Sequence, residues 1–155
     1  MKIIKLTDGQ QALVDDEDYD LISQWNWSVS SYGYAYKNKN GSILMHVAIM
    51  NTPKGMQTDH INGNKLDNRR ENLRICTTAQ NQFNSKPHSD NIYSKHKGVS
   101  FLKAKKQAKN PWITMINIDG KPTFLGTFAT EIEAAKAYNE ASIKHHGKFA
   151  KLNII

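Results

Sequence analysis

Short stretches of alternating apolar and polar residues dominate the first half of the chain. Alternation with β-branched and aromatic residues predicts strands at 2–6, 11–14, 25–29 and 34–37. The acidic segment 15–24 is expected to form a helical turn whose carboxylates are solvated. The aromatic residues of this half that recur at every second position are Trp25, Trp27, Tyr34 and Tyr36. That spacing favours cross-strand packing over base stacking, so the first half is predicted to be a β-rich scaffold.

The second half has longer strand patterns. Apolar alternation predicts strands at 98–102, 111–118 and 123–128. Asp119-Gly120, between the last two, is typical of a tight hairpin turn. These strands are expected to pair as a three-stranded antiparallel sheet.

One helix is predicted after this sheet, over 130–146. Thr130 and Glu133 have the spacing of a capping box, and Gly147 lies just past the expected end. An apolar stripe along the helix would cover one face of the sheet and leave the other face free. The whole chain is therefore predicted to be an α+β protein.

Residues 84–95 separate the two halves. They are rich in Ser, Asn, Pro and Lys and lack apolar periodicity, which is typical of a linker. The expected organisation is a first domain at 1–83, a linker at 84–95 and a second domain at 96–155.

The segment 57–74 concentrates residues that carry chemistry. Asp59 and His60 end an extended stretch, and Asn62-Gly63-Asn64 is a turn signal that reverses the chain. Asn68 with Glu71 has the spacing of a second capping box, so a helix is predicted from Asn68 through Ile75. That helix would bring Asn72 close to Asp59.

These residue types suit hydrolysis of a phosphodiester. A carboxylate (Asp59) and a carboxamide oxygen (Asn72) are hard ligands for Mg²⁺ or Mn²⁺. A neutral histidine (His60) takes a proton from water near neutral pH. The alternative is a polar hairpin whose Asp and Asn side chains make only turn hydrogen bonds.

This segment resembles the ββα-metal core of the HNH endonuclease family, in the form found in phage and intron homing endonucleases. The resemblance extends over about 46–82. It implies that Asp59 and Asn72 bind the metal, that His60 is the general base and that Asn68 orients it. His46 matches a histidine that recurs before the hairpin in this family. Its role is either at the phosphate or in packing, because Val47 replaces the basic residue that usually follows.

The composition of the chain limits which metal sites it can form and whether it can span a membrane. Cys76 is the single cysteine, so no internal disulfide and no cysteine-rich zinc site can form, and no zinc is expected. No apolar run approaches the roughly 18 residues of a membrane span, and the N-terminus lacks the apolar core of a signal peptide. The protein is therefore expected in the cytoplasm of a bacterial or phage-infected cell.

The positive charge is unevenly placed. Residues 1–90 hold ten Lys or Arg and ten Asp or Glu, whereas residues 91–155 hold eleven and four. Such a basic segment is typical of a nucleic-acid surface, with a solvated basic face as the alternative. Its loop Lys103–Lys109 is expected to contact phosphates.

The second half resembles the plant ethylene-response-factor (APETALA-type) DNA-binding domain, through 97–100, Trp112, 125–128, 134–139 and 147–153. In that family the sheet enters the major groove, and the guanine-reading arginines are here largely Ser and Lys. The implied DNA contacts are Lys97, Ser100, Lys103, Lys105, Trp112, Thr114 and Lys121. For Trp112, a position in the core of the sheet is an equal alternative. The candidate phosphate clamps beside the first site are Arg69, Arg70 and Arg74.

Together these features predict a metal-dependent endonuclease that hydrolyses duplex DNA. The products would carry 5′-phosphate and 3′-hydroxyl ends. A non-cleaving DNA-binding regulator derived from a nuclease is the main alternative, and an RNA-directed protein is a third. The chain is expected to act as a monomer or a dimer, which decides between nicking and double-strand cleavage.

Overall fold

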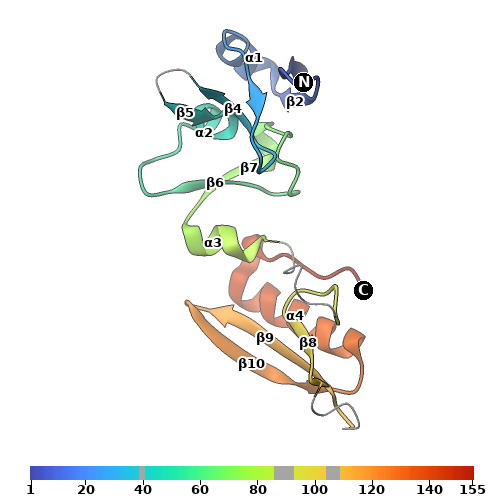
Figure 1. The fold of residues 1–155 in the computed structure, drawn as a ribbon. Coiled ribbons are helices and arrows are strands. Elements are labelled where there is room, and N and C mark those ends of the chain that lie inside the picture. Colours follow the sequence, from blue (N-terminus) through green and yellow to red (C-terminus); the bar gives the residue numbers. More distant parts are fainter. Residues whose placement is uncertain (39–40, 86–92, 104–108) are drawn as a thin grey trace. The chain divides into compact units, whose positions relative to one another are not determined.

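The computed structural model describes residues 1–38, 41–85, 93–103 and 109–155. The chain divides into two compact units, Met1–Asn81 and Gln82–Ile155 (Figure 1). The elements that begin in unit 1 are β1 (Lys2–Lys5), β2 (Gln11–Val14), α1 (Asp16–Ile22), β3 (Ser28–Val29), β4 (Ala35–Asn38), β5 (Ser42–Leu44), α2 (Met45–Met50), β6 (Gln57–His60), η1 (Arg70–Asn72), β7 (Leu73–Cys76) and α3 (Thr78–Phe83). Those of unit 2 are β8 (Val99–Phe101), β9 (Trp112–Ile118), β10 (Lys121–Phe128), α4 (Glu131–His146) and η3 (Gly147–Phe149).

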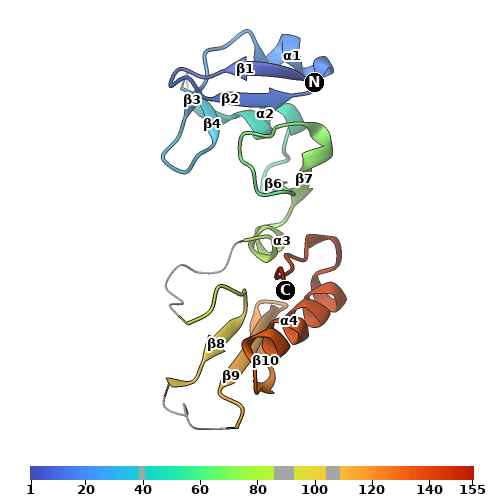
Figure 2. The same cartoon turned by 90° about the vertical axis from the view of Figure 1, so that its right-hand side faces the viewer.

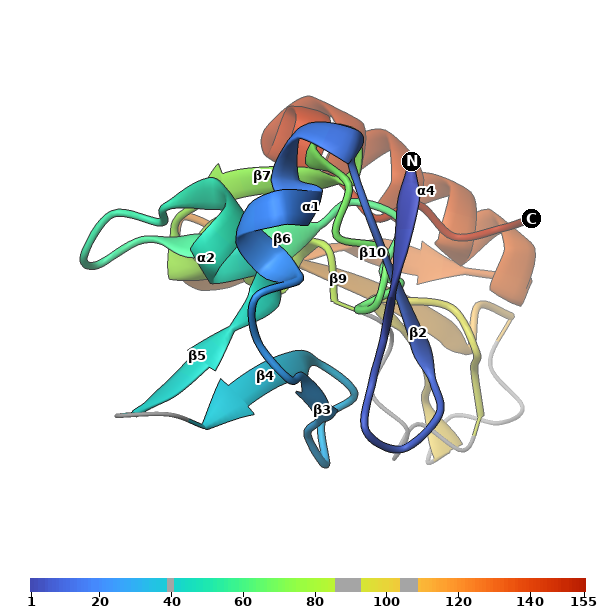
Figure 3. The ribbon, with the colours of Figure 1, turned by 90° about the horizontal axis from the view of Figure 1, so that it is seen from above.

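Unit 1 is built from small antiparallel sheets around one apolar core. The sheets are β1-β2, β3-β4-β5 and β6-β7, and α1 lies beside α2 next to the β1-β2 hairpin (Figure 3). Trp27 is fully buried in the core, and its indole Nε1 donates to the backbone oxygen of Ile22 at 2.8 Å. Trp25 packs edge-on against it. Trp27 thus lies in the core as expected, but both residues precede β3, so their contact is not the predicted packing across strands.

Strand β2 supports the loop that follows β6. Leu13 donates its N–H to the oxygen of Leu66 and accepts from the N–H of Asn68, both at 2.8 Å. An isolated parallel bridge joins Leu13 to Asp67. Because backbone hydrogen bonds fix the loop on both sides of Asp67, the N-terminal hairpin acts as a scaffold for it.

The helix predicted from Asn68 through Ile75 is wrong. Arg70–Asn72 form a single 3₁₀ turn, and Leu73–Cys76 form β7, which pairs antiparallel with β6. Leu73 faces the core as expected, but it does so from a strand. The pairing with β6 and the burial of Leu73 and Cys76, at the two ends of β7, outweigh the local capping signal at Asn68 and Glu71.

The helix of this core begins later, at Thr78. Thr77 and Gln80 form a reciprocal capping pair: Gln80 N donates to Thr77 Oγ1 at 3.2 Å, and Thr77 N donates to Gln80 Oε1 at 2.9 Å. This satisfies two N-terminal amide groups of α3. The hairpin and helix of a ββα core are therefore β6, β7 and α3.

Unit 2 has the predicted sheet and helix. Its strands pair in the order β10-β9-β8, all antiparallel, and α4 lies along one face (Figure 2). Asp119 and Gly120 both have positive φ angles, as a tight hairpin turn requires. The capping box at Thr130 and Glu133 is confirmed, and Gly147 ends the helix. The chain is therefore an α+β protein.

The close approach of α4 to the sheet depends on a glycine. Gly98 has a φ of +75°, and a Cβ atom there would lie 2.1 Å from the Tyr138 ring. A side chain at this position would push the helix away from the sheet. Across the described ranges, no helix is long and apolar enough to cross a membrane.

Candidate active site

His60 is the last residue of β6 and is buried, with 4% of its surface exposed. Its Nε2 atom lies 3.3 Å from Oδ1 of Asn68, which is fully buried. A carboxamide oxygen only accepts, so Nε2 carries the proton in this contact and the lone pair of the neutral ring is on Nδ1. The structure thus brings together the two residues expected to act as base and orienting group.

The surroundings of His60 favour its neutral form. Burial lowers the pKa of its imidazole, and the positive charge of Lys65 adds to this effect. The hydrogen bond to Asn68 and the charges of Asp59 and Asp67 act in the opposite direction. Since the lowering by burial prevails, the ring can accept a proton at neutral pH.

Two further rings pack around His60. The His46 ring, on α2, meets it edge-on with centroids 4.8 Å apart, and Tyr34 lies 5.2 Å from His46 and 5.9 Å from His60. Burial, followed by the neighbouring His60, lowers the pKa of His46 to about 4. Among the described residues, His46 Nδ1 is buried without a hydrogen-bond partner. His46 is therefore a neutral ring that packs against His60.

Asp59 is buried one residue before His60. Its Oδ2 accepts from Arg74 Nε at 2.9 Å and from the terminal nitrogen Nη2 of the same guanidinium at 2.6 Å. The two residues lie opposite each other in the β6-β7 ladder. The predicted metal ligand is therefore held by the arginine that was predicted to clamp phosphate.

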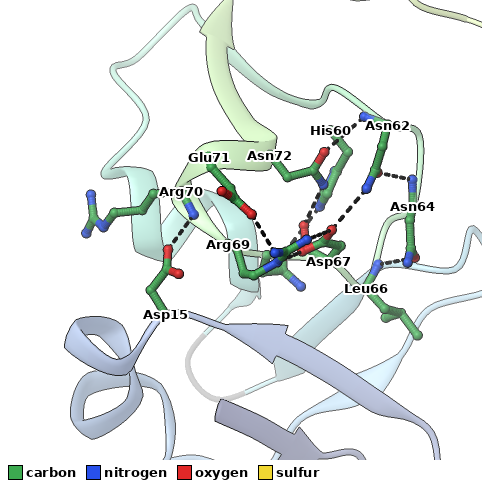
Figure 4. A network of polar contacts seen from close by, with 11 residues as sticks. Asp15, His60, Asn62, Asn64, Leu66, Asp67, Arg69, Arg70, Glu71 and Asn72 are labelled. Carbon is green, nitrogen blue, oxygen red and sulfur yellow. Dashed lines mark hydrogen bonds and ion pairs between the residues drawn. The ribbon is translucent and has the colours of Figure 1, made fainter. Parts of the chain in front are cut away.

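Asn72 is engaged within the loop and not with Asp59. Its Oδ1 accepts from the N–H of Asn62 at 2.9 Å, and its Nδ2 donates to the oxygen of Asp67 at 2.8 Å (Figure 4). The expected approach of Asn72 to Asp59 depended on the helix that the structure replaces with η1 and β7. The Asn72 side chain thus joins two positions, Asn62 and Asp67, of the loop between β6 and β7.

Asn81, on α3, was not among the predicted site residues. Its Nδ2 donates to Gln57 Oε1 at 2.7 Å. Gln57 and Asp59 are two residues apart on β6, so their side chains share one face of the hairpin. The Thr77 and Gln80 capping signal could have located the helix that presents Asn81 to this face.

Arg69 and Arg70, also predicted as phosphate clamps, pair with carboxylates other than that of Asp59. Arg69 donates from Nε and Nη2 to the Asp67 carboxylate at 2.7 and 2.8 Å and also pairs with Glu71. Arg70 makes a bidentate contact with Asp18 at 2.7 and 2.8 Å (Figure 4 shows the neighbouring contacts). With Arg74 on Asp59, all three guanidinium groups have carboxylate partners.

In unit 2, several predicted DNA contacts face inward. Thr114 is fully buried and donates to the oxygen of Ala134, and Trp112 packs against the core under α4. Lys97 Nζ donates at 2.7 Å to the oxygens of Phe83 and Ser85, and burial lowers its pKa to about 8. These side chains thus make packing contacts and hydrogen bonds inside unit 2.

Other predicted contacts are accessible. Ser100, Lys103 and Lys121 are exposed, and Lys105 lies outside the described residues. On the sheet face away from α4, Met115 and Phe124 pair across β9 and β10 with 40% and 58% of their surfaces exposed. The free face therefore carries exposed apolar side chains as well as polar ones.

The comparison with protein families identifies the hairpin and helix. Residues 51–83 match the sequence model of the HNH endonuclease family. They form an HNH endonuclease domain. The match covers β6, β7 and α3 with the loop between them, so it includes His60, Asn68 and Asn81. It makes the chain a nuclease, an enzyme of the hydrolase class.

The similarity to a curated viral protein extends over both units. A protein of Acanthamoeba polyphaga mimivirus named "Uncharacterized HNH endonuclease L560" is 29% identical over 153 residues, covering 95% of this chain and 76% of the relative. No solved structure gives a significant match.

Proposed function

We propose that the chain is a metal-dependent endonuclease that hydrolyses phosphodiester bonds in duplex DNA. One observation carries the proposal: in an HNH domain, a buried neutral histidine is held through Nε2 by Asn68, directly after a buried carboxylate. His60 Nδ1 would take a proton from the attacking water. In-line attack would leave 5′-phosphate and 3′-hydroxyl ends.

The donor set near His60 fits a hard divalent cation. Asp59 offers a carboxylate, and Asn81 offers a carboxamide oxygen from α3 on the same side of the hairpin. The described residues contain no cluster of three His, Cys, Asp or Glu side chains that could hold a metal. Two oxygen donors, with water and phosphate in the remaining positions, suit Mg²⁺ or Mn²⁺. A bound cation would stabilise charge on the leaving 3′ oxygen.

Arg74 is hydrogen-bonded to the Asp59 carboxylate in the structure. Metal binding would require Arg74 to move away or to share this carboxylate with the metal. Nε and Nη2 of Arg74 both donate to Oδ2 of Asp59. Asn72 is less suited as the second ligand, because its oxygen already accepts from the Asn62 N–H. We therefore favour Asn81 over Asn72.

Unit 2 would bind the DNA. Its three-stranded sheet with one covering helix is the arrangement expected from the resemblance to the APETALA-type domain. The excess of positive charge lies in residues 91–155, and Ser100, Lys103 and Lys121 are exposed. A homing role is proposed on the resemblance to homing endonucleases.

Cleavage of supercoiled plasmid tests this function. Wild type and His60→Ala would be compared with Mg²⁺, with Mn²⁺ and with EDTA. The expected result is metal-dependent nicking or linearisation that His60→Ala loses, with the ratio of the two products reporting strand handling. DNA from the genomic neighbourhood of the coding sequence would serve as a second substrate, in case the plasmid lacks the recognition site.

Binding without cleavage on both substrates and with every metal would instead identify a non-cleaving DNA-binding protein. Competition between duplex DNA and structured RNA would separate the DNA proposal from an RNA-directed function.

A further inference from the structure

Four cationic side chains lie in the segment 61–74, and they differ in what balances their charge. The three arginines each pair with a carboxylate. Lys65 instead donates from Nζ to the backbone oxygen of Tyr32 at 2.7 Å, and its ammonium lies 4.5 Å from the centroid of the Tyr34 ring. A carbonyl and a ring face are neutral overall. Lys65 is therefore the cation of this segment that has no carboxylate partner among the residues that the structure describes.

The position of Lys65 is fixed by the turn at 32–34. Gly33 has a φ of +81°, and a Cβ atom built on it would be 3.7 Å from Lys65 Cδ, so the lysine stem runs over the turn. The turn is closed by hydrogen bonds from Gly33 N to Ser30 O and from Tyr34 N to Ser30 Oγ. A charged group held in place before binding loses less conformational entropy when a ligand arrives.

This turn lies next to the general base. The Tyr34 ring that meets the Lys65 ammonium also contacts the rings of His46 and His60. The positive charge of Lys65 is close enough to contribute to the lowered pKa of His60, after burial. The cation and the base are thus neighbours across one aromatic ring.

We propose that Lys65 binds a backbone phosphate of the nucleic acid at the nuclease site, with Tyr32 and Tyr34 holding its ammonium in place. An ammonium has three donors and Tyr32 takes one, which leaves two for phosphate oxygens. This inference rests on the proposed nuclease function, because it assigns Lys65 to the phosphate on which His60 acts or to its direct neighbour.

Binding measurements test the proposal independently of cleavage. In the full chain carrying His60→Ala, and in EDTA, affinity for a short DNA duplex would be measured over a range of salt concentrations. Lys65→Met keeps the apolar stem and removes the charge. It should make the slope of log K against log salt shallower by about 0.9, the value for one lost phosphate contact.

Matched variants control this measurement. Lys65→Arg should keep the wild-type slope. Lys2→Met removes another ammonium that lies over a tyrosine, 4.4 Å from the Tyr19 ring, and should also leave the slope unchanged. Thermal unfolding of each variant would show that the fold is retained.

Cleavage by the otherwise wild-type chain adds a second measurement. Lys65→Met should lower kcat/KM by about tenfold, corresponding to the loss of one charge-assisted contact, and Lys65→Arg should restore most of it. An unchanged salt slope in folded Lys65→Met would overturn the proposal, whatever its cleavage rate. If the wild type binds DNA but never cuts, the nuclease function fails while the slope still decides whether Lys65 binds phosphate.

Discussion

Among single residues, the hydrogen bonds of buried polar atoms determine how the side chains of the candidate site are held. Asn68 is fully buried and its Oδ1 contacts Nε2 of His60, while its Nδ2 has no hydrogen-bond partner among the described residues. A buried donor without a partner costs free energy. That cost falls on the residue whose oxygen contacts Nε2 of His60, the base in the proposed mechanism.

Asn68→Ala should therefore impair catalysis more than stability. Without the acceptor, the His60 ring would lose its fixed orientation and tautomer, and the cleavage rate should fall by about tenfold to hundredfold. The nitrogen-15 shifts of the His60 ring would show whether the Nε2-protonated form is lost. Asn64→Ala, in the same loop but exposed, is the control. A rate equal to wild type would show that Asn68 does not orient the base.

His46 makes the stability of the chain sensitive to acid. Its pKa of about 4 in the folded protein lies below the usual 6.5, so the unfolded chain binds a proton first as the pH falls. Stability should decline from about pH 6.5 to pH 4, by up to about 3 kcal/mol from this residue. The neighbouring His60 and Tyr34 offer no negative charge that would offset the protonated ring.

Denaturant unfolding between pH 7 and pH 4 would measure this decline. His46→Gln cannot titrate and should show a shallower dependence on pH than wild type. Equal pH dependence in the two proteins would mean that His46 is protonated as easily in the folded chain as in the unfolded one.

Among the elements of the HNH domain, β6 and α3 carry the residues of the proposed site. β6 carries Asp59 and His60, and α3 presents Asn81 to the same hairpin. The loop between β6 and β7 is held by Asn72 and by the backbone of β2. The asparagines at 72 and 81 should therefore respond differently to substitution.

Asn81→Ala should raise the Mg²⁺ concentration needed for half-maximal cleavage with little effect on stability, since Asn81 makes one partly buried contact with Gln57. Asn72→Ala should destabilise the chain by about 1–3 kcal/mol, because it leaves the Asn62 N–H and the Asp67 oxygen without their partner. Metal titrations and thermal unfolding of both variants would separate the two roles. The opposite pattern would make Asn72 the metal ligand.

At the scale of the whole molecule, charge and chemistry lie in different units. The HNH domain is in the first part of the chain, and the excess of lysine is in residues 91–155. The mimivirus relative matches 95% of this chain, so the similarity includes both parts. This arrangement is consistent with a nuclease whose DNA affinity comes mainly from its second unit.

The salt dependence of DNA binding should report that unit. If about five lysines contact phosphates, the slope of log K against log salt should be near −4.5. Lys121→Met should reduce its magnitude by about 0.9. Lys97→Met should leave the slope unchanged and lower stability, because the Lys97 ammonium is engaged with the oxygens of Phe83 and Ser85. A change of slope in Lys97→Met would instead indicate that Lys97 contacts DNA.

Local signals in the sequence were sufficient where neighbouring residues decide the structure. The Asp119-Gly120 turn, the capping box of α4 and the sheet-plus-helix order of the second half could be predicted because each depends on a few adjacent residues. The contact between His60 and Asn68 also depends on a short stretch of chain, since the two residues are eight positions apart.

Tertiary structure decided the features that depend on distant partners. Leu73–Cys76 form a strand because β6 is available to pair with them, although Asn68 and Glu71 carry a helix signal. Because a strand replaces the predicted helix, Asn72 does not approach Asp59. Asn81 lies on α3, the helix that follows. Carboxylates at positions 18, 59 and 67 likewise pair with three arginines, whereas Lys65 contacts a backbone oxygen and, in the part of the chain that the structure describes, no carboxylate. The sequence by itself determined which chemical groups the site contains, and long-range pairing determined which of them face one another.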